Sequence, residues 1–105
     1  MNYRVELTPQ ARQDLARWYD DLLDQARTVE ALQWAERALA ALDTALRIQL
    51  ARSPFIYRPV PGSSGLRREL VIPVGAKGYV ALYEIAAPGH VLVLAVRHQL
   101  EEDYH

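Results

Sequence analysis

The sequence predicts an α+β domain in which a helical hairpin covers one face of a small, mostly antiparallel sheet. The expected order of elements is β-α-α-β-β-β. It follows from a strictly alternating segment at the start of the chain, two segments with helical apolar spacing, and three strand-like runs separated by short turns. The 105 residues, half of them hydrophobic, suit one ordinary core, so residues 1–105 are expected to form a single domain.

Residues 2–7 alternate between polar and apolar side chains, which is the pattern of a strand with one buried face. Thr8 and Pro9 follow, a capping residue and a first-turn residue that together predict the start of a helix. Apolar side chains then recur at spacings of four, three and four: Ala11, Leu15, Trp18 and Leu22. This spacing predicts an amphipathic helix of about twenty residues.

A second helix is expected to begin at Thr28, another capping residue, with Glu30 near its positive end. Its apolar stripe uses spacings of three and four residues: Leu32, Ala35, Leu39, Leu42, Leu46 and Leu50. The stripe covers only about two heptads, fewer than a coiled coil needs, so it indicates core packing. The short link between the two helices predicts an antiparallel hairpin.

The second half of the chain is predicted to be extended. Ser53 and Pro54 end the second helix, and residues 55–65, which contain proline and glycine, form a connector. Strands are expected at residues 66–74, 79–86 and 90–97, joined by turns short enough to force antiparallel pairing. The last strand is apolar on both faces, which places it inside the sheet with the first strand as its second neighbour.

Several classes of function are excluded by residue types that the chain lacks or places wrongly. Without cysteine it has neither a disulfide scaffold nor a thiolate metal site. Gly62 and Gly65 precede a strand and not a helix, so they do not form a nucleotide-binding loop. No Gly-x-Ser-x-Gly elbow of a serine hydrolase occurs either. Neither a cofactor nor a small-molecule substrate is expected.

Metal sites and membrane spans are not expected either. His98, Glu102 and His105 would share one face of a helical tail, but a solvated tail is the simpler interpretation and no metal site is predicted. The longest uncharged run, residues 85–96, has 12 residues and contains proline and glycine, so it is too short and broken to span a bilayer. Charges at Arg4 and Glu6 argue against a signal peptide, and a cytoplasmic protein is expected.

Positive charge is concentrated in the middle of the chain. The net charge is −1, but residues 47–77 carry +5, whereas residues 1–46 and residues 78–105 carry −3 each. Eleven of the twelve basic residues are arginine, the side chain suited to planar contacts with carboxylates, phosphates or base edges. This distribution fits either a solubilising surface or a surface that recognises an anionic partner.

The arginines of greatest interest lie at strand ends. Arg67-Arg68 opens the second predicted strand, and Arg97-His98 closes the last one. Because consecutive strand residues point to opposite faces, each pair places one cation on each side of the sheet. Arg68 is expected on the helix-covered side, either paired with a carboxylate such as Glu69, Glu84 or an aspartate of the first helix, or exposed at the edge of a cleft.

Five pieces of sequence, spread over nearly all 105 residues, carry a family resemblance: Tyr3-x-Val-x-Leu-Thr-x-x-Ala11-x-x-Asp14-Leu15, Ser53-Pro54 with Arg58-Pro59, Leu66-Arg67-Arg68-Glu69-Leu70, Tyr79-x-x-Leu82-Tyr83-Glu84-Ile85, and the run from Val91 to His98. In this order they resemble the RelE/ParE superfamily of toxins from bacterial type II toxin–antitoxin modules. The resemblance implies a RelE-like fold and a growth-inhibiting toxin that an antitoxin neutralises.

The superfamily has two mechanistic branches. RelE-like members are ribosome-dependent, metal-independent mRNA endonucleases, for which the resemblance implies Arg68, Arg97, His98 and Tyr104 as catalytic positions. ParE-like members poison DNA gyrase and lack that catalytic set. The single lysine, Lys77, and the separation of Tyr104 from His98 favour the ParE-like branch with no catalytic residue. The net charge of −1 also suits a protein target better than ribosomal phosphates.

The mRNA endonuclease is the alternative, and a module protein that binds only its antitoxin is a third hypothesis. On the favoured interpretation five residues are expected to face the target: Arg58, Arg67, Arg68, Arg97 and His98. Four residues of the helical hairpin are expected to bind an antitoxin segment that folds on contact: Trp18, Tyr19, Leu22 and Trp34. Trp34 lies off the leucine stripe, so it is either an exposed anchor or packed against the first helix.

Overall fold

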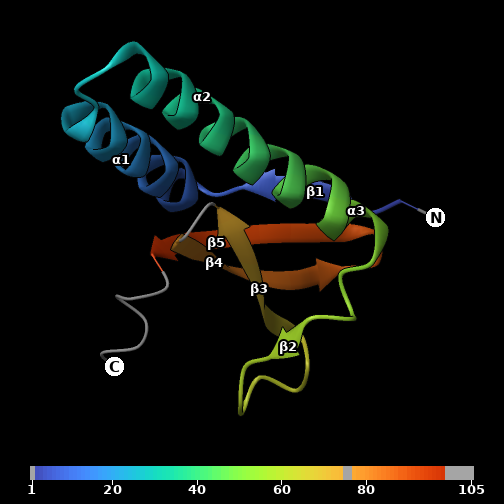
Figure 1. Ribbon diagram of the computed structural model, residues 1–105. Helices are drawn as coiled ribbons and strands as arrows, with labels where there is room; N and C mark the ends of the chain where they lie inside the picture. The colour runs from blue at the N-terminus through green and yellow to red at the C-terminus, as the bar shows by residue number, and fades with distance from the viewer. Residues whose placement is uncertain (1, 75–76, 99–105) are drawn as a thin grey trace.

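The computed structural model describes residues 2–74 and 77–98. The helices and strands are β1 (Arg4–Leu7), α1 (Pro9–Gln25), α2 (Val29–Thr44), the π-helical segment η1 (Ala45–Gln49), α3 (Leu50–Arg52), β2 (Arg58–Pro59), β3 (Arg67–Val74), β4 (Lys77–Ala87) and β5 (His90–His98). Figure 1 shows α1 and α2 side by side over one face of the sheet. The predicted α+β class and the helical hairpin on a single face are confirmed.

The five strands form one sheet in the order β1-β5-β4-β3-β2. β1 runs parallel to β5, and the other neighbouring pairs are antiparallel. The predicted position of the last strand, inside the sheet and beside the first strand, is therefore confirmed. β2 was not expected: two residues of the connector pair with β3, with Arg58 opposite Glu69.

Both helices begin at the predicted caps. The Thr8 hydroxyl accepts a hydrogen bond from the Ala11 amide at 3.2 Å, and the Thr28 hydroxyl accepts one from the Ala31 amide at 3.0 Å. Each bond satisfies one of the amides that a helix leaves without a partner in its first turn. A link of three residues then connects α1 to α2, which explains why the helices pack as a hairpin.

The second predicted helix is interrupted. α2 passes into η1 before the single turn of α3, and such a π-helical segment shifts the rotational phase of the residues beyond it. Leu42, Leu46 and Leu50 are all buried across this segment. Leu32 departs from the expected stripe, since 40% of its surface is exposed. It lies in the first turn of α2, and Figure 1 shows that this end of α2 is the one that points away from the sheet.

The core lies between the helices and the sheet. Its largest fully buried side chains come from the second helical segment and the central strands: Leu42, Leu46, Leu50, Tyr79, Tyr83, Val91, Val93 and Val96. Among the residues that the structure describes, Asp14 of α1 is the only buried charged side chain. A buried carboxylate is costly unless hydrogen bonds compensate it, so its contacts bear directly on the candidate site.

Candidate functional site

The predicted target-binding residues are divided between the two faces of the sheet. Arg68 alternates with the buried Leu70 and Ile72 of β3, so it points toward the helices as predicted. Arg67, its neighbour, points to the opposite face, which no helix covers in the described part of the chain and which we call the open face. At the end of β5 the same alternation puts Arg97 on the open face and His98 on the helix-covered face.

Two arginines of the open face are held by carboxylates of the neighbouring strand. Arg58 Nη2 lies 2.8 Å from Glu69 Oε1, and Arg67 Nε lies 2.9 Å from Glu84 Oε1. Both pairs are directly opposite in the register of the sheet. About half of each arginine side chain stays exposed, so such pairs contribute only about 0–1 kcal/mol, but they neutralise much of the local positive charge. The positive charge on this face is therefore weaker than the arginines in the sequence suggest.

Arg68 was expected either to pair with a carboxylate or to be exposed at the edge of a cleft, and among the residues that the structure describes it does neither. Its guanidinium donates to three backbone carbonyls, from Nε to Gly65 at 2.9 Å and from Nη1 to Phe55 and Tyr57 at 2.8 Å each. It also lies over the Phe55 ring, 5.6 Å from the centroid. The side chain thus ties the connector to β3, because each of these carbonyls belongs to the segment between α3 and β3.

Arg97 and His98 have different surroundings. Arg97 is exposed and, within residues 2–74 and 77–98, has no carboxylate partner. The His98 ring is half-buried against two aromatic rings, 5.7 Å from Trp18 and 5.5 Å from Tyr79 between centroids. Trp18 and Tyr79 also meet edge to face at 5.9 Å. We call Trp18, Tyr79 and His98 the aromatic cluster.

The aromatic cluster is joined to the backbone of β5 through α1. Trp18 Nε1 donates to the Val96 carbonyl at 3.1 Å, and the Val96 amide donates to Asp14 Oδ2 at 2.9 Å. Burial, followed by the negative charge of Asp21, raises the pKa of Tyr79 above its ordinary value of 10.0. The Tyr79 phenol therefore stays protonated to a higher pH than an exposed tyrosine does.

Arg68, Arg97 and His98, the described residues that a ribonuclease would use, do not converge on one point. In the register of the sheet Arg68 lies opposite Tyr83, whereas His98 lies opposite Tyr79, which precedes Tyr83 by four residues in β4. Standard strand geometry therefore separates the Cα atoms of Arg68 and His98 by about 13 Å along the strands and about 10 Å across the sheet. Arg97 points to the other face from His98, and the fourth candidate, Tyr104, lies outside the described residues.

The residues predicted to bind an antitoxin have mixed environments. Trp18, Leu22 and Trp34 are partly buried and pack against the core, so the packed alternative describes Trp34 better than an exposed anchor does. Tyr19 lines a groove of about 770 Å³ between α1 and α2. The small side chains Ala16 and Ala40 also line this groove, which we call the interhelical groove.

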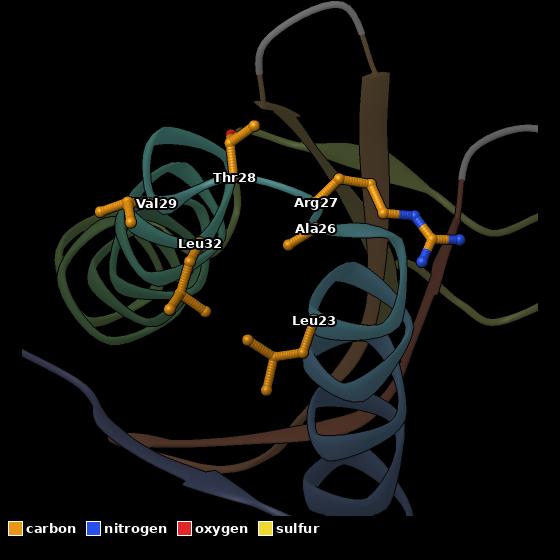
Figure 2. A pocket seen from close by; sticks show the side chains of 6 residues that line it. All are labelled: Leu23, Ala26, Arg27, Thr28, Val29 and Leu32. Atoms are coloured by element: carbon orange, nitrogen blue, oxygen red, sulfur yellow. The ribbon is translucent and has the colours of Figure 1, made fainter.

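A second hollow lies at the tip of the hairpin and was not anticipated from the sequence. Figure 2 shows Leu23 of α1 and Leu32 of α2 facing one another across the link between the helices. The hollow has a volume of about 460 Å³ and is lined by Leu23, Ala26, Arg27, Thr28, Val29 and Leu32. Val29 is 67% exposed, which makes this tip one of the apolar parts of the surface.

Neither a metal site nor a membrane span is found in the part of the chain that the structure describes. There, no three histidine, aspartate or glutamate side chains lie close enough to hold a metal ion. The tail residues Glu102 and His105 of the pattern considered above lie outside that part. A helix with the length and apolar character required to cross a bilayer is likewise absent from the described ranges.

Comparison with solved structures shows which known proteins share this fold. The toxin–antitoxin complex RelBE2 from Mycobacterium tuberculosis matches at 24% identity and a TM-score of 0.63, over 94% of this chain and 100% of that one. A chromosomal ParDE system from P. aeruginosa matches at 14% identity and 0.68, over 91% and 95%. A mutant of E. coli toxin RelE in the free state matches at 16% identity and 0.56, over 99% and 92%. At these identities the likeness shows the fold of type II toxins.

The sequence itself identifies the family. A model of the ParE toxin of type II toxin–antitoxin systems, parDE, matches residues 5–103. The chain therefore belongs to the ParE toxin family, and the predicted membership of the RelE/ParE superfamily is confirmed. No curated protein matches the chain.

Proposed function

We propose that this toxin inhibits growth by acting on DNA gyrase without cutting RNA itself, and that a cognate antitoxin neutralises it. The separation of Arg68 from His98 is the observation that carries the proposal. A nuclease that uses both must bring them to one phosphate, because an acid or base works only within hydrogen-bond reach of the reacting atoms. Arg68 is also occupied by three carbonyls of its own chain.

The distribution of charge supports a protein target over ribosomal RNA. Binding among densely spaced phosphates gains much of its affinity from the counterions that many cations release. Here Arg58 and Arg67 are paired with Glu69 and Glu84, and the whole chain carries a charge of −1. Protein interfaces instead depend on a few anchors, among which arginine and aromatic side chains are enriched.

The end of β5 is our candidate for the surface that meets gyrase. Arg97 offers an exposed guanidinium there, and the aromatic cluster lies on the other face of the same strand end. Arg67 and Arg58 lie on the same face as Arg97 and provide further polar contacts. Since gyrase acts on the bacterial chromosome, this proposal places the action of the toxin in the cytoplasm.

The interhelical groove is our candidate for the antitoxin site. It offers Tyr19, Leu15 and Leu39 as apolar walls, with charged side chains of both signs at its margins. Such a groove fits an amphipathic helix that folds on contact. The related RelBE2 structure is that of a toxin–antitoxin complex, which supports an antitoxin partner for this chain.

Two assays on the purified protein test the target. The first follows supercoiling and DNA cleavage by gyrase, and the second follows cleavage of mRNA on programmed ribosomes. We expect gyrase inhibition by the wild type, and a loss of about tenfold or more in Arg97→Ala, as for an interface anchor. Arg37→Ala is the matched control, because Arg37 is an exposed arginine of α2 away from the sheet end.

Three outcomes would contradict the proposal. Ribosome-dependent mRNA cleavage that disappears in His98→Ala would establish the nuclease. Equal inhibition of gyrase by Arg97→Ala and the wild type would remove the end of β5 from the target surface. A protein that binds its antitoxin but affects neither gyrase, mRNA nor growth would be a module protein without toxicity.

A further inference from the structure

β5 is longer than the strand beside it. β1 pairs with β5 only as far as Leu7 opposite Val93, after which the chain leaves the sheet through Thr8 and enters α1. Within residues 2–74 and 77–98, the rest of β5, from Leu94 to the candidate target surface at Arg97 and His98, therefore has no strand on that side. A bare edge of this kind leaves backbone donors and acceptors unpaired.

Side chains of α1 occupy this edge. The Thr8 hydroxyl shares its one proton between the carbonyls of Val93 and Leu94, at 3.0 and 3.1 Å. Beyond them, Asp14 accepts the Val96 amide and Trp18 donates to the Val96 carbonyl, at 2.9 and 3.1 Å. Asp14 and Trp18 are four residues apart, so one face of the helix presents both to the same residue of the strand. Asp14 and Trp18 together provide hydrogen-bond partners for the amide and the carbonyl of Val96, the two groups that a neighbouring strand would otherwise have paired.

The contacts of Asp14 match what a buried carboxylate needs. Only 5% of Asp14 is exposed, and its other oxygen accepts from Gln10 Nε2 at 2.8 Å. Arg17 contributes a more distant charge, with Nη2 at 4.0 Å from Oδ1. Hydrogen bonds to an ionised acceptor are stronger than those between neutral groups, so Asp14 holds the Val96 amide more firmly than a neutral side chain would.

We propose that Asp14 and Trp18 are positioning residues that replace the missing strand and fix Arg97 and His98 for target recognition. Val96 immediately precedes these two residues, so fixing its peptide groups sets the direction of both side chains. Trp18 contributes in two ways, because its indole nitrogen binds the Val96 carbonyl and its ring contacts His98. The inference rests on the proposed function, since it concerns the surface proposed to meet gyrase.

Nuclear magnetic resonance on the purified full chain tests the positioning directly. In Asp14→Ala we expect the Val96 amide to exchange with solvent about tenfold or more faster relative to the rest of the sheet, because a charged hydrogen bond is lost. The His98 ring signals should shift in the same variant. Asp14→Asn keeps an oxygen that accepts the Val96 amide but loses the charge, so it should restore the His98 signals and slow Val96 exchange well below the rate in Asp14→Ala, without reaching the wild-type rate.

Two further variants separate positioning from a general loss of stability. Tyr83→Phe removes a buried hydrogen bond to the Pro54 carbonyl and serves as the matched control, with Val96 exchange and His98 signals expected as in the wild type. Trp18→Phe keeps an aromatic ring but removes the donor to Val96. It should accelerate exchange near Val96, and it carries the test if Asp14→Ala does not fold.

The proposal is overturned if Trp18→Phe and any folded Asp14→Ala protein keep wild-type exchange and His98 signals. It is also overturned if the Val96 amide exchanges as fast in Asp14→Asn as in Asp14→Ala. These readouts need no target, so they stand even if the wild type proves inactive on gyrase, a result that would refute the proposed function alone. If the wild type does inhibit gyrase, we expect inhibition to weaken in Asp14→Ala and recover in Asp14→Asn. Undiminished inhibition in a variant with disordered Arg97 and His98 would also overturn the proposal.

Discussion

Arg68 holds three carbonyls of the connector, and this arrangement predicts how the residue responds to substitution. Arg68→Lys keeps the charge, but a single ammonium cannot reach Gly65, Phe55 and Tyr57 in the geometry that a planar guanidinium allows. We expect a loss of about 2 kcal/mol in the free energy of unfolding, measured in urea. Arg67→Lys, which alters only an exposed ion pair with Glu84, should cost about 0.5 kcal/mol or less. Equal losses in the two variants would contradict the structural role of Arg68.

The sequence could predict the face of Arg68 but not its partners. Alternation along a strand is a local property, and it placed Arg68 with Leu70 and Ile72 correctly. Its partners are carbonyls of an irregular connector, and backbone groups have no sequence signature. The ion pairs of Arg58 and Arg67 depend on strand register, which the sequence alone leaves open.

The buried role of Asp14 could have been inferred from its position in the sequence. It stands between Ala11 and Leu15 on the buried side of the first helix, one turn before Trp18, where an apolar residue would be expected. A charged residue in such a stripe indicates a specific buried partner, because burial without one is unfavourable. The partner itself, the Val96 amide, is 82 residues away and only the fold reveals it.

Two buried tyrosines predict the behaviour of the protein in alkali. Burial is the main cause that raises the pKa of both Tyr79 and Tyr83 above 10.0, whereas in the unfolded chain they ionise at about 10. A raised pKa in the folded state stabilises the protein fully below pH 10, and this contribution is lost as the pH rises further. We expect the free energy of unfolding to fall above about pH 10, and to fall less steeply in Tyr83→Phe. Urea unfolding at a series of pH values checks this, and parallel curves for the two proteins would contradict it.

At the scale of elements, the caps of the two helices should differ in strength. Thr28 makes one capping bond, so Thr28→Ala should cost about 1 kcal/mol. Thr8 caps α1 and also donates to two carbonyls of β5, so Thr8→Ala should cost about 2 kcal/mol. Thr44, where no side-chain cap bond forms, provides the control, and Thr44→Ala should be nearly neutral in urea unfolding. A larger loss in Thr28→Ala than in Thr8→Ala would show that the bonds to β5 contribute little.

Regular elements were predictable because each repeats a local pattern several times. The alternation of residues 2–7 and the spacing from Ala11 to Leu22 identified a strand and a helix, and both threonine caps were correct. η1 and β2 were not predicted. A π-helical segment has no apolar period of its own. β2 has just two residues, and among the described residues β3 is the only strand that pairs with it. Both result from packing and not from local preference.

At the scale of the whole molecule, the fold separates two kinds of surface. The sheet end presents Arg97 and the aromatic cluster, whereas the helical hairpin presents the interhelical groove on the opposite layer. The sequence indicated both regions through its strand-end arginines and hairpin aromatics. The sequence could not indicate that Trp18 lies at the sheet end and Tyr19 in the interhelical groove. Successive residues of a helix are rotated by about 100°, so the two side chains point in different directions, and only the packing shows what each one contacts.

This separation predicts that toxicity and neutralisation can be uncoupled. Ala40→Trp should fill part of the interhelical groove, whose wall includes Ala40, and weaken antitoxin binding by about thirtyfold or more, as at an interface hot spot. Ala41→Trp is the matched control, because Ala41 is exposed on the same helix but does not line the groove. Both variants should still inhibit growth, since neither touches the sheet end. Coexpression with the cognate antitoxin should then rescue cells that carry Ala41→Trp and fail to rescue those that carry Ala40→Trp. Equal rescue of both variants would show that the antitoxin does not bind in the interhelical groove. A loss of toxicity in Ala40→Trp alone would indicate that the target binds there instead.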